Sequence, residues 1–176
     1  MIVKVIETNS HYLERVREIN EDAFPVEERM SVNEMYDWQG KSEVLGFYEN
    51  EQLIGFTLIL TNETVVFIVL LAIDNRYRGH GYGTKALAAI RGQFPNRQII
   101  LDFEEVIENS ANYAQRVSRK RFYLRNGFHE TCRYTILSGG RYEVVCSEKV
   151  LDEAALLEIM SLIHKHTPEF DERLFH

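Results

Sequence analysis

The stretch of sequence that decides the fold spans residues 65–87 and reads VVFIVLLAIDNRYRGHGYGTKAL. Its first nine residues, 65–73, are all apolar and do not alternate with polar residues, as is typical of a strand covered on both faces. Glycines follow at positions 79, 81 and 83, and residues 82–94 then carry apolar side chains at helical spacing. The pattern predicts a buried strand that passes through a glycine-rich turn into a helix.

The glycine-rich turn has the features of an anion site. Alternate glycines let the backbone turn tightly and approach a ligand, and the first amides of the following helix are unpaired. Arg76, Arg78 and Lys85 add positive charge. The Walker and dinucleotide patterns do not fit, because Thr84 precedes Lys85 and occupies the position of the third dinucleotide glycine. We expect a phosphate or pyrophosphate ligand here, and a turn without a ligand is the alternative.

The composition limits the class of protein. The chain has 176 residues, of which 45% are hydrophobic and 27% charged, as in a globular domain. Its net charge of −7 argues against nucleic-acid or anionic-membrane partners. The longest apolar run is shorter than the roughly 20 residues of a membrane-spanning helix, and the N-terminus lacks a signal-peptide profile. We expect a cytoplasmic protein, and the histidine and cysteine spacings predict no metal site.

The remaining periodicities predict a mixed fold. Strands are expected at 2–7, 43–49, 52–61, 64–73, 99–103, 128–137 and 141–149. Helices are expected at 10–23, with Ser10 as N-cap, and at 27–38, 82–94, 111–126 and 152–165. The fold class is therefore α+β, with a central, mixed and mostly antiparallel sheet of seven strands flanked by helices.

The last two strands are expected to form a hairpin. A three-residue loop, Ser138–Gly140, would place Cys132 opposite Cys146, and we expect both as free thiols.

Two motifs resemble those of a known family. Arg78-x-x-Gly81-x-Gly83, preceded by Leu71-Ala72-Ile73-Asp74, resembles the acetyl-CoA signature of the GNAT superfamily of N-acetyltransferases. The segment 122–128, FYLRNGF, is similar to the Tyr-x-x-x-Gly-Phe segment of that superfamily. The order of elements agrees from residue 2 to about residue 149. We therefore expect a GNAT-like domain at residues 1–150 and a C-terminal helical extension at 151–176, packed on the same domain.

The resemblance implies acetyl-CoA as acyl donor. Backbone amides from Arg78 to Thr84 would wrap the pyrophosphate, and the main chain of 71–73 would hold pantetheine at a strand bulge. The residues implied in cofactor binding are Leu71, Ala72, Ile73, Arg78, Gly79, His80, Gly81, Tyr82, Gly83, Thr84 and Phe122. Arg116 and Arg119 stand where many members have Asn and a small residue, and either reach the adenosine phosphates or only solvate their helix.

The resemblance also implies catalytic residues. Tyr123 matches a tyrosine near the thioester sulfur, and a packed aromatic at a helix end is the alternative. The strand at 65–73 contains no acid, so the base is expected on the next strand. Asp102 is the first candidate and Glu104, on the same strand face, the second. The alternative, of equal weight, is that both are solvated carboxylates at the end of a strand.

The acceptor side is less defined. Phe24, Glu27, Glu28 and Tyr36 lie where the family selects its acceptor, and their charge suits a cationic amine, although a solvated helix face explains it too. The acceptor is expected to be a small-molecule amine, a protein N-terminus or a lysine. A non-catalytic acyl-CoA sensor is the alternative function. The helix at 152–165 either closes the sheet or forms a homodimer contact.

Overall fold

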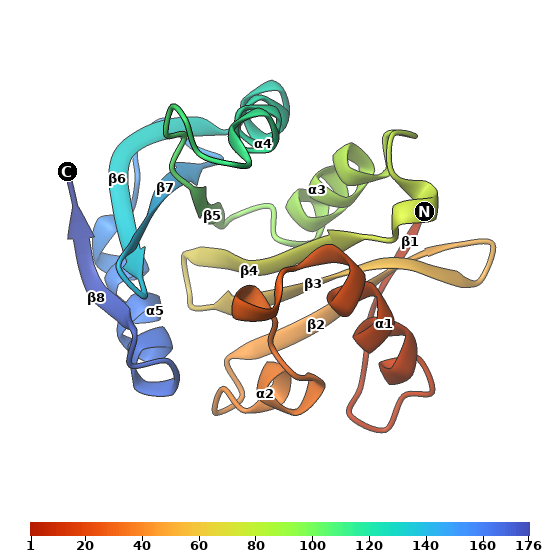
Figure 1. Cartoon of the computed structure of the whole chain (residues 1–176). Helices are drawn as coiled ribbons and strands as arrows, with labels where there is room; N and C mark the ends of the chain where they lie inside the picture. Colours follow the sequence, from red (N-terminus) through yellow and green to blue (C-terminus); the bar gives the residue numbers. More distant parts are fainter. The chain divides into compact units, whose positions relative to one another are not determined.

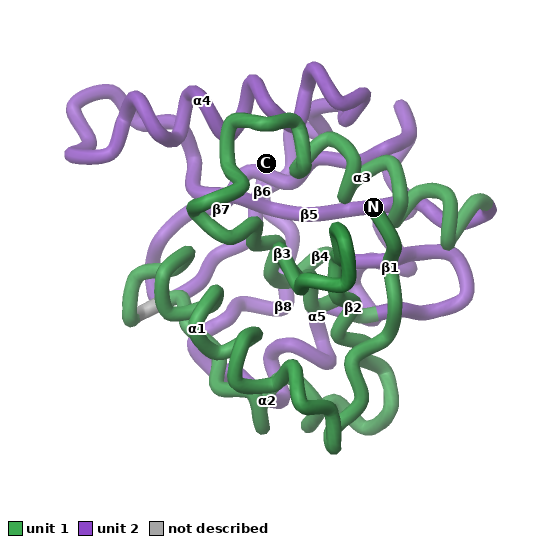
Figure 2. Tube along the Cα trace, turned by 90° about the vertical axis from the view of Figure 1, so that its right-hand side faces the viewer, with its two compact units in different colours: residues 1–60, 68–95 green, residues 61–67, 96–176 purple. Residues whose placement is uncertain are grey.

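The computed structural model describes the whole chain except the side chain of Glu27. The chain forms two compact units, one of residues 1–60 and 68–95 and one of residues 61–67 and 96–176 (Figure 2). Each unit is described by itself below. No helix among the described residues is both long enough and apolar enough to cross a bilayer.

The strands form a mixed sheet, as predicted, but there are eight rather than seven, in the order β1-β2-β3-β4-β5-β7-β6-β8. The pairings β1–β2, β2–β3, β5–β7, β6–β7 and β6–β8 are all antiparallel. The strands are β1 (Ile2–Val5), β2 (Ser42–Glu49), β3 (Gln52–Thr61), β4 (Val65–Ile73), β5 (Gln98–Glu104), β6 (His129–Leu137), β7 (Gly140–Cys146) and β8 (Phe170–Phe175).

The first unit is built around β2, β3 and most of β4. Long runs of β2 and β3 are buried without alternation, because helices cover both of their faces. Helices α1 (Leu13–Ala23) and α2 (Val32–Tyr36) lie on one side of these strands and α3 (Tyr82–Gln93) on the other (Figures 1 and 2). Val16 and Ile19 of α1 and Met35 of α2 pack into a core with Phe56 and Leu58 of β3.

The helix predicted at 27–38 is wrong in extent. A short 3-10 helix, η1 (Val26–Glu28), is followed by extended backbone, and α2 begins only after Ser31. The Ser31 hydroxyl accepts the Glu34 amide while the Glu34 carboxylate accepts the Ser31 amide, so a capping box fixes the helix start. The Ser-x-x-Glu spacing was a readable signal for this boundary.

The predicted N-cap of the first helix is also wrong. α1 begins after Tyr12, whose side chain makes no capping bond. The Tyr12 amide instead donates a hydrogen bond to the Ser10 hydroxyl oxygen. Ser10 therefore closes the turn that precedes the helix.

The second unit contains β5, β7, β6 and β8, with α4 (Tyr113–Arg125) against β5 and α5 (Glu153–His166) beside β8 (Figure 1). Strand β8 was not predicted, because three of the six residues in its sequence, FDERLF, are charged. It pairs with β6 from Leu137 opposite Phe170, and its edge position lets charged side chains reach solvent.

The expected pairing of the two cysteines is wrong. The β6–β7 hairpin turns through two residues, Ser138 and Gly139, which both have positive φ, so Leu137 pairs with Gly140. The register then shifts between Glu130 and Arg133, and Cys132 lies in this bulge with a φ of 55°. Cys146 is buried opposite His129, whereas Cys132 is exposed, and both are free thiols.

Candidate functional site

The glycine-rich loop of the first unit leaves β4 through a short 3-10 helix, η2 (Asn75–Tyr77), and enters α3 at Gly81. Gly79 and Gly81 have φ values of 79° and 80°, in the left-handed region that favours glycine. No atom lies within 4 Å of the position that a Cβ would take at either residue, so backbone conformation is what requires glycine there.

The amides of this loop divide into bonded and unbonded groups. The Arg78 amide donates to the Asn75 carbonyl at 3.2 Å, so it is already engaged, contrary to the expectation that it binds a ligand. The Lys85 amide bonds the Gly81 carbonyl at 3.1 Å and is the first donor paired within α3. The amides of Tyr82, Gly83 and Thr84 precede it and form the helix N-terminus, where an anion is stabilised.

A buried carboxylate anchors the start of the loop. Asp74 is only 4% exposed, and it accepts the Arg76 amide at 3.0 Å and the Arg76 guanidinium at 2.8 Å. Arg15 of α1 forms a second ion pair with the same carboxylate. Asp74 therefore couples α1 to the loop, which limits the motion of the amides that follow.

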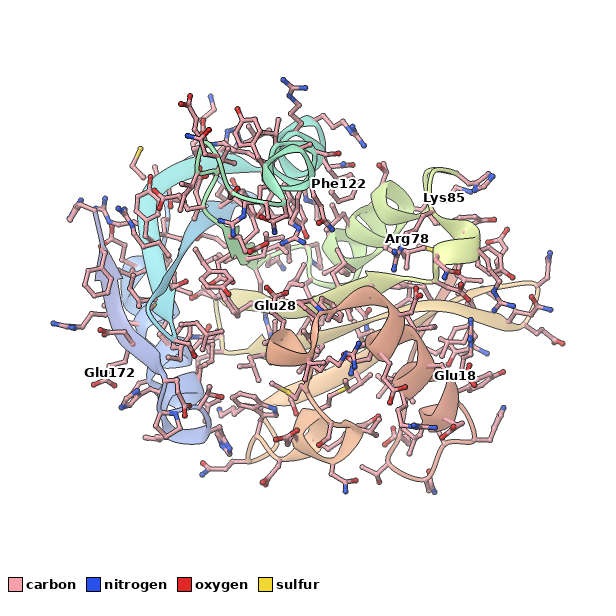
Figure 3. All side chains as sticks on the ribbon, in the orientation of Figure 1. Glu18, Glu28, Arg78, Lys85, Phe122 and Glu172 are labelled. Atoms are coloured by element: carbon pink, nitrogen blue, oxygen red, sulfur yellow. The ribbon has the colours of Figure 1, made fainter. Side chains whose placement is uncertain are left out.

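The cationic side chains of the loop are partly exposed to solvent. Arg78 donates to the Ile73 carbonyl at 2.8 Å and lies 3.4 Å from Asp22, but half of its side chain stays exposed. Lys85 lies 4.7 Å from the ring centre of Tyr82. Figure 3 shows that Arg78 comes from the loop and Lys85 from the start of α3. The ring of His80 lies close to the loop backbone, because its Nδ1 is 2.8 Å from the carbonyl oxygen of Arg78, within hydrogen-bond distance.

The end of β4 is less buried than its beginning. Residues 65–68 are buried, whereas Val69, Leu71 and Ile73 are partly exposed and alternate with buried Leu70 and Ala72. β3 lies so close to β4 here that a Cβ on Gly55 would meet the Ala72 carbonyl oxygen at 2.5 Å. The exposed side of 71–73 is thus the part of β4 accessible to a ligand, while the predicted bulge stays a prediction.

In the second unit, Tyr123 lies in an aromatic cluster on α4. Its ring stacks on Phe103 of β5 at 5.5 Å and meets Phe122 and Phe128 edge-on at 5.2 and 5.8 Å. Burial raises the pKa of Tyr123 to about 12; Arg119 opposes this rise and the charge of Asp102 adds to it. The phenol is therefore protonated at neutral pH.

The two candidate bases on β5 have different surroundings. Glu104 is held by Arg116 at 2.7 Å, by Arg119 at 3.4 Å and by the Asn112 amide group at 3.1 Å. These partners all come from α4 or its N-cap, so Glu104 joins α4 to β5. Asp102 is half-buried and accepts a hydrogen bond from the Thr135 hydroxyl at 2.5 Å.

The alternation of side chains along β5 separates Asp102 from Phe103, the residue on which Tyr123 stacks. Neighbouring strand residues leave opposite faces, so Asp102 emerges on the face away from Phe103. The ring of Tyr123 covers the Phe103 face. The charge of Asp102 nevertheless contributes to the raised pKa of Tyr123, so the two groups lie within electrostatic reach of each other.

Sequence reasoning missed a second cluster of charges. Glu143 of β7 is 6% exposed and accepts two bonds from the Lys120 ammonium, at 2.8 and 3.0 Å, and Lys120 also pairs with Glu130 at 2.5 Å. Burial raises the pKa of Glu143 above its usual value, although Lys120 opposes this effect. No local sequence motif indicates such a cluster, because its three members come from α4, β6 and β7.

The predicted acceptor residues are distributed between core and surface. The Tyr36 hydroxyl donates to the Ile6 carbonyl at 2.6 Å, and burial, with smaller effects of Glu7 and Tyr48, raises the pKa of Tyr36 to about 12. The Phe24 side chain packs against the core of the first unit. Glu28 lies on η1 (Figure 3) and is partly buried, and the side chain of Glu27 lies outside the described part. Tyr36 and Phe24 thus contact the core of the first unit, and their part in acceptor binding stays a prediction.

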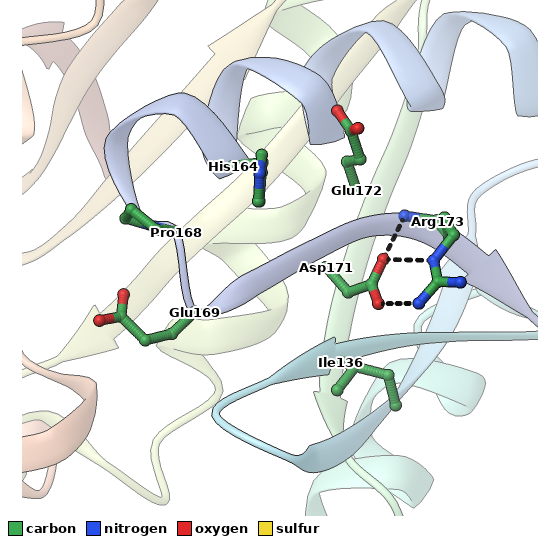
Figure 4. Close-up of a pocket in the computed structure, with 7 residues that line it drawn as sticks. All are labelled: Ile136, His164, Pro168, Glu169, Asp171, Glu172 and Arg173. Carbon is green, nitrogen blue, oxygen red and sulfur yellow. Dashed lines mark hydrogen bonds and ion pairs between the residues drawn. The ribbon is translucent and has the colours of Figure 1, made fainter.

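A pocket of about 310 Å³ lies elsewhere in the second unit, at the end of α5 (Figure 4). It contains none of the predicted site residues, and its carboxylate Asp171 is already paired with Arg173 at 2.7 Å. The described part of the chain holds no group of three or more His, Cys, Asp or Glu side chains arranged to bind a metal ion. The residues that line the pocket are Ile136, His164, Pro168, Glu169, Asp171, Glu172 and Arg173.

Comparison with known proteins shows the family of the chain. The family model of the acetyltransferase (GNAT) family matches residues 13–128, which include the glycine-rich loop, both carboxylates of β5 and Tyr123. A search of curated proteins finds no match.

Solved structures share the fold. A protein assigned to the GNAT family from Bacteroides thetaiotaomicron is 20% identical over 94% of this chain and 97% of its own, with a TM-score of 0.77. The ribosomal-protein-S18-alanine N-acetyltransferase of Escherichia coli is 16% identical over 82% and 90%, with a TM-score of 0.61. A GNAT family acetyltransferase from Elizabethkingia anophelis with acetyl-CoA bound is 12% identical over 84% and 97%, also with a TM-score of 0.61.

Proposed function

The chain belongs to the GNAT family of acetyltransferases, and on that premise we propose that it moves the acetyl group of acetyl-CoA to a primary amine. The observation that carries the proposal is the anion site at the start of α3. Two glycines with positive φ lead into a helix whose first amides have no partner within the helix, beside the partly exposed cations Arg78 and Lys85. A diphosphate is the ligand class that this arrangement suits.

The contacts of the loop support a division of roles. The amides of Tyr82, Gly83 and Thr84 would bind the pyrophosphate, while Arg78 would contribute its side chain rather than its engaged amide. Asp74 would hold the loop in place through Arg15 and Arg76. The Elizabethkingia anophelis protein of the same fold binds acetyl-CoA, which supports this donor.

The residues of β5 and α4 support the chemistry. The nitrogen of the neutral amine attacks the thioester carbonyl carbon, the C–S bond breaks, and the products are an N-acetyl amide and coenzyme A. Asp102 would take the proton of the amine, because Glu104 is committed to Arg116 and Arg119. Tyr123 would donate a hydrogen bond to the leaving sulfur.

Complete proton transfer from Tyr123 to the sulfur is unfavourable. The pKa of its phenol, about 12, exceeds the pKa of an ordinary thiol, about 8.5. Tyr123 would therefore stabilise the departing thiolate, which takes its proton from solvent. Most of the rate would come from positioning the two reactants.

The acceptor is proposed as a class. Either a small-molecule amine or a protein N-terminus or lysine fits the chemistry, and the Escherichia coli protein of the same fold acetylates the alanine of a ribosomal protein. The net charge of the chain, −7 at pH 7, favours a cationic acceptor. A cytoplasmic location and a homodimer stay predictions from the sequence.

Two measurements test the function. Calorimetry with acetyl-CoA should show binding, and a thiol-release assay with a panel of small amines and N-terminal peptides should show turnover with at least one of them. No heat and no thermal shift with millimolar acetyl-CoA would contradict the proposal. Binding without thiol release for any amine would instead indicate an acyl-CoA sensor.

Tyr123→Phe tests the role of the phenol. The change keeps the stacked ring and removes the hydroxyl, so we expect kcat to fall about tenfold while the dissociation constant of acetyl-CoA stays within a factor of two. An unchanged kcat would show that Tyr123 only packs.

A further inference from the structure

The hydroxyl of Thr135 donates to a carboxylate on a strand that is not its neighbour, whereas Thr64, which also donates to a carboxylate, does so at the surface. Thr135 lies on β6 and is fully buried, and its Oγ1 donates to Asp102 Oδ2 on β5 at 2.5 Å. In the order of strands, β7 lies between β5 and β6, so this hydrogen bond bridges over an intervening strand. Side-chain contacts that only stabilise a sheet normally join adjacent strands.

Two other threonines show the ordinary arrangement. The hydroxyl of Thr57 donates to the Leu70 carbonyl and that of Thr131 to the Val144 carbonyl, both at 2.7 Å. Each of these bonds satisfies a side chain with backbone. Thr135 instead donates to a carboxylate, and a hydrogen bond to an ionised group is shorter and stronger than one between neutral groups.

We propose that Thr135 is a positioning residue that orients the Asp102 carboxylate for removal of the acceptor proton. The inference rests on the proposed role of Asp102 as the base. The bond fixes Oδ2 and thereby the direction of the whole carboxylate, since its two oxygens share one plane. A donor to the charged form also favours that form over the protonated one.

The charged groups around Asp102 would stay the same when Thr135 is changed. On the neighbouring elements these include Glu104 on the same strand, Glu143 on β7, Arg133 on β6 and Arg119 on α4, and the phenol of Tyr123 on α4 feels the charge of Asp102. Arg133 is paired with Glu153 at 2.7 Å, and Glu143 with Lys120. A shift in the titration of Asp102 on removal of the Thr135 hydroxyl therefore reports the hydrogen bond.

The test compares three variants on β6. Thr135→Val removes the donor with little change in shape, Thr135→Ser keeps the donor, and Thr131→Val removes a hydroxyl that bonds only backbone. We expect Thr135→Val to lower kcat about tenfold and to raise the acidic pKa of the kcat profile by about one unit, with KM for acetyl-CoA unchanged. In Thr135→Ser, kcat and the acidic pKa of the kcat profile should both stay near those of the wild type. Thr131→Val should change neither quantity.

A second readout does not depend on activity. The carboxyl carbon of Asp102, assigned with Asp102→Asn, can be titrated by ¹³C NMR in the free protein, and its pKa should rise by about one unit in Thr135→Val. Thr135→Ala serves the same comparison if the valine variant does not fold. An Asp102 titration and kcat profile equal to wild type in the valine or alanine variant would overturn the inference. A wild-type protein that never releases thiol, with the NMR shift present, would instead contradict the proposed function.

Discussion

Asp102 and Glu104 lie two residues apart on β5, but the structure gives the two carboxylates different hydrogen-bond and ion-pair partners. Glu104 is 17% exposed and neutralised by two arginines of α4, whereas the Asp102 carboxylate accepts a hydrogen bond from the neutral Thr135 hydroxyl. A carboxylate held by two cations is a poor proton acceptor, because its ionised form is strongly stabilised. Residue type and spacing alone do not separate the two.

The residue-scale prediction follows from this difference. Asp102→Asn should lower kcat about a hundredfold and leave the free energy of unfolding nearly unchanged. Glu104→Gln should instead lower the free energy of unfolding by about 2 kcal/mol, since it leaves two partly buried guanidinium groups without their anion. Thiol-release kinetics and urea unfolding of both variants check the pair, and the reverse outcome would make Glu104 the base.

At the scale of the element, the loop before α3 depends on backbone conformation more than on side chains. Gly81 is the N-cap of α3 in the left-handed region, and its conformation points the next amides outward. Gly92, at the other end of the same helix, has no such conformation and no atom within 4 Å of a Cβ position. The two glycines form a matched pair within one helix.

Alanine at these two glycines should have opposite effects. Gly81→Ala should lower the free energy of unfolding by about 1 kcal/mol and weaken acetyl-CoA binding, because alanine disfavours a φ of 80°. Gly92→Ala should raise the free energy of unfolding by roughly 0.5–1 kcal/mol, because alanine loses less chain entropy in a helix. Thermal unfolding and calorimetry with acetyl-CoA measure both. Equal stability in the two variants would show that the loop tolerates other conformations.

At the scale of the whole molecule, buried phenols make stability depend on alkaline pH. Tyr36 and Tyr123 have pKa values of about 12 in the folded chain, against 10.0 for an ordinary tyrosine. A raised folded-state pKa contributes stability that is complete below pH 10 and is lost as the pH rises from 10 to 12. Each phenol lies in a different compact unit, Tyr36 in the first and Tyr123 in the second.

Urea unfolding at pH 8 and pH 11 tests this expectation. The free energy of unfolding should fall between these values, and it should fall less in Tyr36→Phe, which has one buried phenol fewer to ionise on unfolding. At pH 8 the variant should lose about 1 kcal/mol, because the bond to the Ile6 carbonyl is absent. Tyr113→Phe, at an exposed tyrosine, is the control, and a pH dependence in Tyr36→Phe equal to that of Tyr113→Phe would contradict the prediction.

The amino-acid sequence by itself determined the fold class, the family and the conformation of the glycine-rich turn. These features depend on short-range causes: an unbroken apolar run makes a covered strand, and glycine is required where φ is positive. The same short-range reasoning failed where a cap or a bulge shifts a boundary by a few residues, as at Ser31 and Cys132.

Only the tertiary structure decided that Arg116 and Arg119 hold Glu104 and that Thr135 reaches Asp102. It also revealed β8 and the buried Glu143. Each of these depends on residues that are distant in the chain, as Asp102 and Thr135 are. The state of an ionisable group is set by the charges, donors and burial that folding brings to it, and local sequence does not encode these.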